Sequence, residues 1–243
     1  MPDNRSAASV STTSALILAA GLILGLLGLA YCLGQSALAV KALERTVVVK
    51  GLAELEQPAD IVIWPIQFTG ADNNLPALYT SVEADTRAII EFLRERGIQD
   101  SEISTSVPAI TDKLAQQYGG GGVDLRYTAV QTVTVYSSRV DSVRLVINQL
   151  SQLGKRGIAF SGGGYPSTEY LFTGLNAVKP AMIEEATRAA REVAEKFAED
   201  SNSKLGKIKS ASQGQFSISD RDNNNPHIKK LRVVSTVEYY LSD

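Results

Sequence analysis

The hydrophobic pattern separates the chain into a continuous apolar stretch near the N-terminus and a longer region in which apolar and polar residues alternate. No charged side chain occurs from Ser6 to Val40, and the nineteen residues Ala15–Leu33 are almost entirely apolar. A helix of that length extends about 28 Å, close to the thickness of the hydrocarbon core of a bilayer. Since a helix satisfies its own backbone hydrogen bonds in lipid, the pattern predicts a transmembrane anchor over residues 15–40, after a short tail over residues 1–14.

A cleaved signal peptide is the alternative interpretation of this stretch. Ala37-Leu38-Ala39 has the small-x-small form of a signal-peptidase site. The apolar run is longer than the roughly 7–15 residues usual in a signal peptide, and only Arg5 precedes it. We favour an uncleaved anchor, with cleavage after Ala39 left open. Because Lys41 and Arg45 follow the run, the positive-inside rule does not decide its orientation.

After the anchor, runs with strand-like and helix-like periodicity alternate. Strands are predicted over residues 44–51, 60–70, 103–114, 125–138 and 158–161, with two more at the C-terminus, and helices over residues 75–97, 141–153 and 180–201. This order predicts an α+β fold in which helices pack on a mainly antiparallel sheet. No linker longer than a loop interrupts the pattern, so residues 41–243 are predicted to form a single domain.

Glycines are predicted to end three of these helices. Gly97, Gly157 and Gly206 each stand between a helical pattern and an isoleucine-containing strand. Glycine adopts the left-handed conformation that commonly terminates a helix. Before the last of these glycines, the helix predicted from Pro180 carries a broad apolar stripe that includes Val193 and Phe197.

Composition and charge exclude several classes of function. The 243 residues include 24 basic and 26 acidic side chains that are well interleaved. They form no basic patch of the kind that binds nucleic acid, so we expect no nucleic-acid partner. The single cysteine, Cys32, lies inside the apolar stretch, which rules out an intramolecular disulfide and a cysteine-based metal cluster.

None of the motifs that carry chemistry is complete. The glycine runs Gly119–Gly122 and Gly162–Gly164 lack the lysine and the helix start of a phosphate-binding loop. His227 is the only histidine, and no nucleophile elbow accompanies it. The segment Asp220–Asn223 lacks the glycine and the terminal glutamate of a calcium loop. We therefore expect no catalytic, cofactor-binding or metal-binding residues and no enzymatic activity.

Seven short segments, in this order and spacing, are shared with a known family. They are Val47–Gly51, Ala59–Trp64, Arg96–Ile98, Tyr127–Val135, Gly157–Ser161, Ala190–Ala194 and Lys204–Ile208. From about Thr46 to the C-terminus, the chain resembles the SIMPL-domain family of exported bacterial envelope proteins, which includes a periplasmic immunogenic protein and an oxidative-stress-related relative.

The resemblance implies a function in the cell envelope. It implies an α+β domain in the cell envelope and, in some relatives, large ring- or channel-like oligomers. The chain departs from many relatives in having the long apolar stretch over residues 15–40 where they have a signal peptide. We therefore expect a single-pass protein of the bacterial inner membrane with its C-terminal domain in the periplasm. The resemblance supplies no catalytic residues. The leading hypothesis is a non-enzymatic, membrane-anchored homo-oligomer linked to envelope or oxidative stress, whose lipid partner contacts residues 15–40. The alternative is a periplasmic module that binds a peptide or a small ligand of unknown identity, as a monomer or small oligomer.

Overall fold

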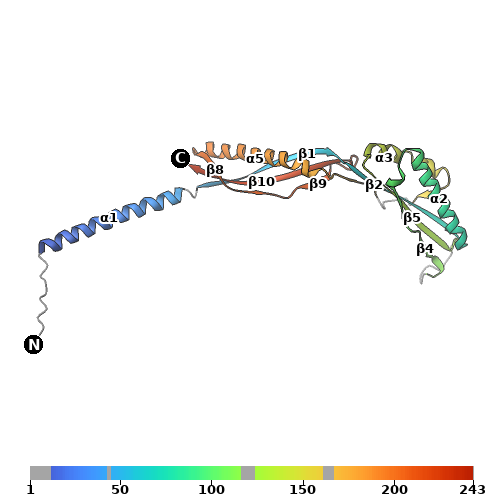
Figure 1. Ribbon diagram of the computed structural model, residues 1–243, viewed down its shortest axis with the longest axis horizontal. Helices are drawn as coiled ribbons and strands as arrows, with labels where there is room; N and C mark the ends of the chain where they lie inside the picture. Colours follow the sequence, from blue (N-terminus) through green and yellow to red (C-terminus); the bar gives the residue numbers. More distant parts are fainter. Residues whose placement is uncertain (1–11, 43–44, 116–123, 161–166, 243) are drawn as a thin grey trace, which may run out of the picture. The chain divides into compact units, whose positions relative to one another are not determined.

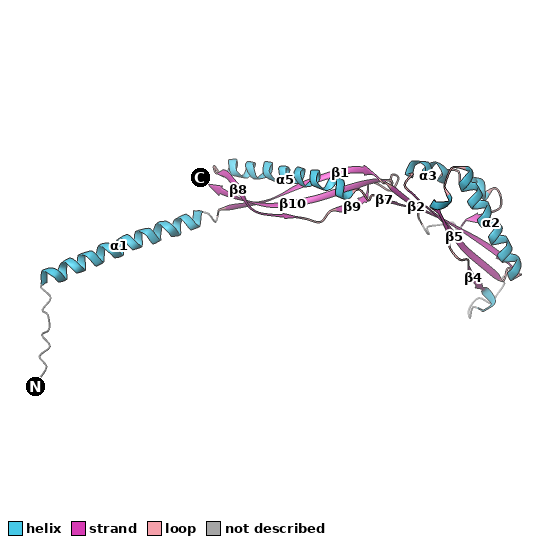
Figure 2. Ribbon diagram, in the orientation of Figure 1, coloured by secondary structure: helices cyan, strands magenta, loops and turns pink. Residues whose placement is uncertain are grey.

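The computed structural model describes residues 12–42, 45–115, 124–160 and 167–242 and shows an α+β fold with two mainly antiparallel sheets (Figures 1 and 2). The helices are α1 (Thr12–Ala42), α2 (Leu75–Glu95), η1 (Asp100–Glu102), η2 (Lys113–Ala115), α3 (Val140–Ile147), α4 (Ser151–Gly154) and α5 (Leu175–Asp200). The strands are β1 (Thr46–Pro58), β2 (Ile61–Asp72), β3 (Ile103–Thr105), β4 (Ala109–Asp112), β5 (Tyr127–Ser137), β6 (Ala159–Phe160), β7 (Glu169–Leu171), β8 (Lys204–Gln213), β9 (Ser217–Asp220) and β10 (Ile228–Ser242). The predicted fold class is confirmed.

Contacts group the chain into two compact units. Unit 1 comprises Met1–Leu52, Glu184–Gly214 and Val234–Asp243, and unit 2 comprises Ala53–Ile183 and Gln215–Val233. The division falls within β1, α5 and β10. The prediction of a single domain over residues 41–243 stays a prediction.

Unit 2 is built on the long antiparallel pair of β2 and β5. Their register runs from Val62 opposite Ser137 to Asp72 opposite Tyr127. β3 and β4 pair with the outer side of β5, and β6 and β7 pair with the outer side of β2. Pro65, which has no N–H to donate, lies on β2 between the residues that pair with β7 and those that pair with β6.

Large side chains form the core of unit 2. Alternate residues of β2, including Trp64 and Phe68, are buried together with their cross-strand partners on β5. α2 lies on this face and buries Leu78, Val82, Ile89, Phe92 and Leu93. α2 begins with a cap, because the side chain of Asn74 accepts a 3.0 Å hydrogen bond from the backbone N–H of Ala77.

In the core of unit 1, small side chains of α5 pack against Val49, Val237 and Tyr239 of the sheet. There β10 pairs with β1 on one side and β8 on the other, and the C-terminal part of α5 packs on this sheet. In the part of α5 that belongs to unit 1, the buried residues are Ala186, Ala190, Ala194 and Ala198. A Cβ atom at Gly51 of β1 would lie 1.9 Å from the carbonyl oxygen of Ala186, so glycine is what allows the strand and the helix to approach this closely.

Several predicted elements differ from the observed ones. β1 continues to Pro58 beyond the predicted end at Gly51, and three strands, β8, β9 and β10, follow α5 where two were predicted. The strand predicted over residues 103–114 is two strands, β3 and β4, separated by Ser106–Pro108. Ser106 still donates a 2.9 Å hydrogen bond to the carbonyl oxygen of Thr132, whereas Pro108 has no N–H to donate. The helix predicted over residues 141–153 is broken into α3 and α4, where hydrogen bonds tighten to three-residue spacing. α5 begins at Leu175 instead of Pro180, so Pro180 lies inside the helix, where it removes one backbone hydrogen bond without ending the helix.

Two of the three predicted glycine caps are confirmed. Gly97 and Gly157 have φ values of 83° and 96°, in the left-handed region. The prediction for Gly206 is wrong, because this residue lies within β8. α5 is followed instead by Asn202 with a φ of 54°, since asparagine also tolerates the left-handed conformation.

Candidate functional site

The most distinctive surface of the described chain is the apolar helix α1. Leu16–Ser36 contains 21 residues without a charged side chain, and the apolar residues of this segment are not buried within the protein. A helix of this length extends about 31 Å, which matches the hydrocarbon core of a bilayer. α1 therefore has the length and composition of a single membrane span or of a signal sequence.

Unit 1 also exposes large apolar side chains outside α1. They are Val48 and Leu52 on β1, Val193 and Phe197 on α5, and Ile208 on β8. The apolar stripe predicted on α5 is thus wider than the part that is buried, because the alanines alone face the sheet and Phe197 remains 54% exposed. β1 is a terminal strand in the order of its sheet, so among the described strands its outer edge has no partner.

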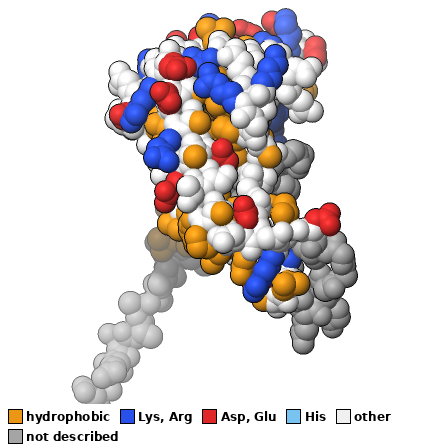
Figure 3. Space-filling view, turned by 90° about the vertical axis from the view of Figure 1, so that its right-hand side faces the viewer, with side chains coloured by type: hydrophobic (Ala, Val, Ile, Leu, Met, Phe, Trp, Pro, Cys, Tyr) orange, Lys and Arg blue, Asp and Glu red, His pale blue; other side chains and the backbone are white. Residues whose placement is uncertain are grey.

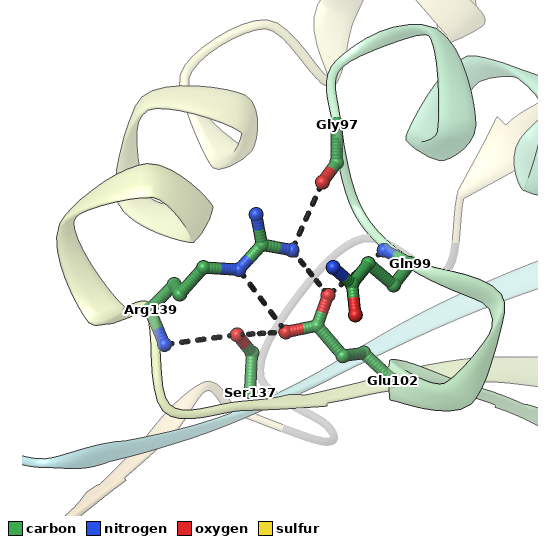
Figure 4. Close-up of polar contacts among 5 residues, drawn as sticks. All are labelled: Gly97, Gln99, Glu102, Ser137 and Arg139. Carbon is green, nitrogen blue, oxygen red and sulfur yellow. Dashed lines mark hydrogen bonds and ion pairs between the residues drawn. The ribbon is translucent and has the colours of Figure 1, made fainter.

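A dense polar cluster lies in unit 2, where the segments after α2 and β5 meet (Figure 4). The Glu102 carboxylate accepts hydrogen bonds from the Arg139 guanidinium, from the Ser137 hydroxyl at 2.6 Å and from the backbone N–H of Gln99 at 2.8 Å. Arg139 also donates to the carbonyl oxygen of Gly97 at 2.9 Å. The cluster therefore joins the chain leaving α2 to the end of β5.

The electrostatics of this cluster suit a structural role. Burial alone would raise the pKa of Glu102, but the hydrogen bonds from Arg139, Ser137 and Gln99 outweigh it and lower the pKa from 4.5 to about 2. A carboxylate with so low a pKa is a poor general base or acid at neutral pH. We infer that the cluster stabilises the fold of unit 2.

A hollow of about 460 Å³ lies beside α2. Tyr79, Val82 and Pro108 give it apolar walls, and Glu83 and Arg87 give it charged ones. Its Gln131 amide is already engaged, because it donates to the carbonyl oxygen of Ser106 at 2.8 Å and accepts from the Thr86 hydroxyl at 3.0 Å. On the side of the molecule that Figure 3 presents, basic, acidic and hydrophobic side chains are intermixed.

Of the polar segment Asp220–Asn223 considered in the sequence, Asp220 ends β9 and the other residues lie on the turn between β9 and β10. Asp220 pairs with Lys229, and the Asp222 carboxylate accepts from Asn225, from the backbone and from Arg221. These carboxylates are thus engaged within the turn. No group of three His, Cys, Asp or Glu side chains in the described part of the chain is placed to hold a metal, and the expectation of no metal site stays a prediction. The two glycine runs lie outside the described residues.

His227 lies beside two residues that are distant from it in the sequence. Its ring lies edge-on to Tyr170 of β7, with 6.1 Å between the ring centroids, and both line a polar hollow of about 360 Å³ with Arg144 of α3. Burial raises the pKa of Tyr170, and the positive charge of Arg144 offsets part of this rise. These three side chains are separated by at least 26 positions along the chain, so no local motif signals their proximity.

A comparison with protein families identifies the family to which the chain is related. Residues 47–235 match the SIMPL family, described as a protein of unknown function (DUF541). The chain belongs to the SIMPL family. The match begins directly after α1 and confirms the resemblance seen in the sequence. A comparison with curated proteins finds no match. Membership of the SIMPL family together with the apolar helix α1 fits a membrane-anchored envelope protein.

Proposed function

We propose that this SIMPL protein is an anchored component of the bacterial cell envelope that acts through assembly of identical copies and not through catalysis. In this proposal α1 stays in the inner membrane, the SIMPL domain lies in the periplasm, and the assembly serves the envelope under stress. The observation that carries the proposal is the helix α1. It is long enough to cross a membrane, its apolar residues are not buried within the protein, and the SIMPL region follows it in the chain.

Unit 1 offers a surface suited to contacts between copies. β1 is a terminal strand of its sheet, and Thr46–Leu52 is the part of it that belongs to unit 1. In this part Val48 is 61% exposed, and Leu52 is exposed on the same side. An unpaired strand edge provides backbone donors and acceptors that pair readily with another strand. Large side chains exposed beside such an edge add apolar area that association removes from water.

The test is the mass of the full-length protein in detergent micelles, measured by mass photometry at micromolar to nanomolar concentration. We expect a discrete oligomer. A clean monomer across that range would contradict the proposal. Intact-mass measurement of the mature protein tests the anchor separately, because cleavage after Ala39 removes most of residues 15–40.

A pair of matched substitutions tests where the contacts lie. Val48→Lys places a charge beside the β1 edge, and we expect it to reduce the number of subunits. Val107→Lys is the control, since Val107 is 87% exposed in unit 2. Equal effects of the two substitutions would show that β1 is not the interface, even if the wild-type chain assembles.

A further inference from the structure

The hollow that contains His227 brings together polar side chains from three separate parts of unit 2. Arg144 and Asn148 come from α3 and its C-terminal end, Tyr170 comes from β7, and Asn223 and Asn224 come from the turn before β10. Arg144 and Asn148 are four residues apart, a spacing that places them on one face of a helix. With its volume of about 360 Å³, the hollow has the size of a site for a small ligand.

The turn that bears the two asparagines is fixed by its own hydrogen bonds. The Asp222 carboxylate accepts from the backbone N–H groups of Asn224 and Asn225, both at 2.9 Å, which is the pattern of an Asx turn. The carbonyl oxygen of His227 accepts a 2.8 Å hydrogen bond from the N–H of Ala59. The turn therefore presents its side chains from a backbone that is held at both ends.

The amide groups that line the hollow are available to a ligand. Asn148, Asn223 and Asn224 are exposed, and within the described ranges their side chains make no hydrogen bond. Each carboxamide both donates and accepts hydrogen bonds. A hydroxyl group also does both, so a ligand rich in hydroxyl groups matches this lining.

Arg144 adds a positive charge with a planar array of donors. Its contact with Asp141, at 3.3 Å, involves a carboxylate whose side chain is 91% exposed, and such exposed pairs contribute little. The hydroxyl of Tyr170 is a second hydrogen-bond partner of Arg144, but a guanidinium has five N–H donors, so donors remain for a ligand. The guanidinium can therefore pair with a ligand carboxylate in two parallel hydrogen bonds, the geometry that arginine favours. A carboxylate at one end and hydroxyl groups along the remainder would use the whole lining.

We propose that this hollow binds a small polyhydroxylated carboxylate of the uronic acid type. Arg144 holds the carboxylate, and the carboxamides of Asn148, Asn223 and Asn224 hold the hydroxyl groups. The ring of Tyr170 forms an apolar side for the carbon skeleton. This site is independent of assembly, and it gives the binding-module alternative a specific place in the fold.

The only histidine of the chain provides a direct readout. Burial lowers the pKa of His227, Arg144 adds to this effect, and the remaining charges that act on it are Asp141, Arg221 and Asp222. The phenol of Tyr170 faces the same ring. A bound carboxylate favours the imidazolium form, so ligand binding is expected to raise the pKa of His227.

The experiment is a titration of untagged full-length protein in micelles with D-glucuronate, followed by NMR of the ¹³C-labelled imidazole. We expect a saturable shift of the one histidine signal and an upward shift of its pH midpoint at saturation. Neutral D-glucose is the control for charge, and inorganic phosphate is the control for simple anion binding. A missing or unsaturable shift overturns the proposal, and so does an equal response to either control.

Two variants and a matched control locate the binding. Arg144→Gln should weaken glucuronate binding by at least about tenfold, as expected for the loss of a charged hydrogen-bonding partner. Asn148→Ala should weaken it by about fivefold. Arg188→Gln, on the exposed surface of α5, should leave it unchanged. Unchanged binding in both hollow variants, with their circular dichroism spectra intact, would show that glucuronate binds elsewhere.

Discussion

The two units are stabilised by cores of opposite kinds. In unit 2, phenylalanine, tryptophan, leucine, isoleucine and valine fill the space between α2 and the sheet of β2 and β5. In unit 1, a row of alanines on α5 lies against a sheet in which Gly51 stands at the closest approach. Burial of large side chains removes more apolar area from water, whereas close approach of backbones leaves no space for an added atom.

Because of this difference, we expect the two units to be sensitive to opposite substitutions. A core of large side chains is weakened when atoms are removed, because a cavity remains. A core of small side chains is weakened when atoms are added, because strand and helix must separate. Paired substitutions of the same residue type can therefore separate the two kinds of core.

The largest expected effect is that of Phe92→Ala in unit 2. Phe92 is fully buried, and the guanidinium carbon of Arg96 lies 3.6 Å from its ring centroid. We expect the free energy of unfolding to fall by about 3–5 kcal/mol. Urea denaturation measures it through the fluorescence of Trp64, the single tryptophan, which is buried in the same core.

Phe197→Ala in α5 is the matched control, because Phe197 is exposed. We expect it to change the free energy of unfolding by less than about 0.5 kcal/mol. A loss comparable to that of Phe92→Ala would mean that the surface around Phe197 is covered in the folded protein, as an interface between copies would cover it.

Gly51→Ala is expected to have the next largest effect, in unit 1. The added methyl group would lie 2.4 Å from the backbone nitrogen of Ala190 and 1.9 Å from the carbonyl oxygen of Ala186. We expect destabilisation by about 2–3 kcal/mol, seen as faster hydrogen exchange in the peptide that covers Glu184–Asp200. Gly154→Ala, where a Cβ atom meets nothing within 4 Å, should not accelerate exchange, and equal acceleration by both would show that close approach is not what stabilises unit 1.

A smaller, pH-dependent effect is expected for Glu102→Gln. The folded-state pKa of Glu102 lies below its ordinary value, at about 2, so the carboxylate stabilises unit 2 fully above about pH 4.5 and progressively less as the pH falls toward 2. We expect the substitution to lower the free energy of unfolding by about 1–3 kcal/mol at pH 7.

The pH profile separates this effect from a loss of packing. The difference between wild type and Glu102→Gln should shrink below pH 4.5, whereas Glu192→Gln on the exposed face of α5 should show no such trend. A constant difference between pH 7 and pH 3 would mean that the charge of Glu102 is not what stabilises the cluster.

Local patterns predicted much of the fold and little of the surface chemistry. The apolar run of α1, the alternation in β2 and the cap at Asn74 are set by neighbouring residues, so they are visible in sequence. The need for glycine at position 51 and the proximity of Arg144 to His227 depend on residues distant in sequence. Periodicity marked Phe197 as apolar but could not distinguish the buried part of the stripe from the exposed part.

If α1 is the membrane span that we propose, it has a consequence for the rate at which copies meet. A protein held by such a helix diffuses in two dimensions, with its domain confined to a layer one molecule deep beside the bilayer. Tethering of this kind raises the effective concentration of partners and converts part of the binding event into a lateral search. An interface too weak to hold two dissolved copies together can therefore be sufficient at the membrane. The helix also holds the tethered end of every copy at the same depth in the bilayer.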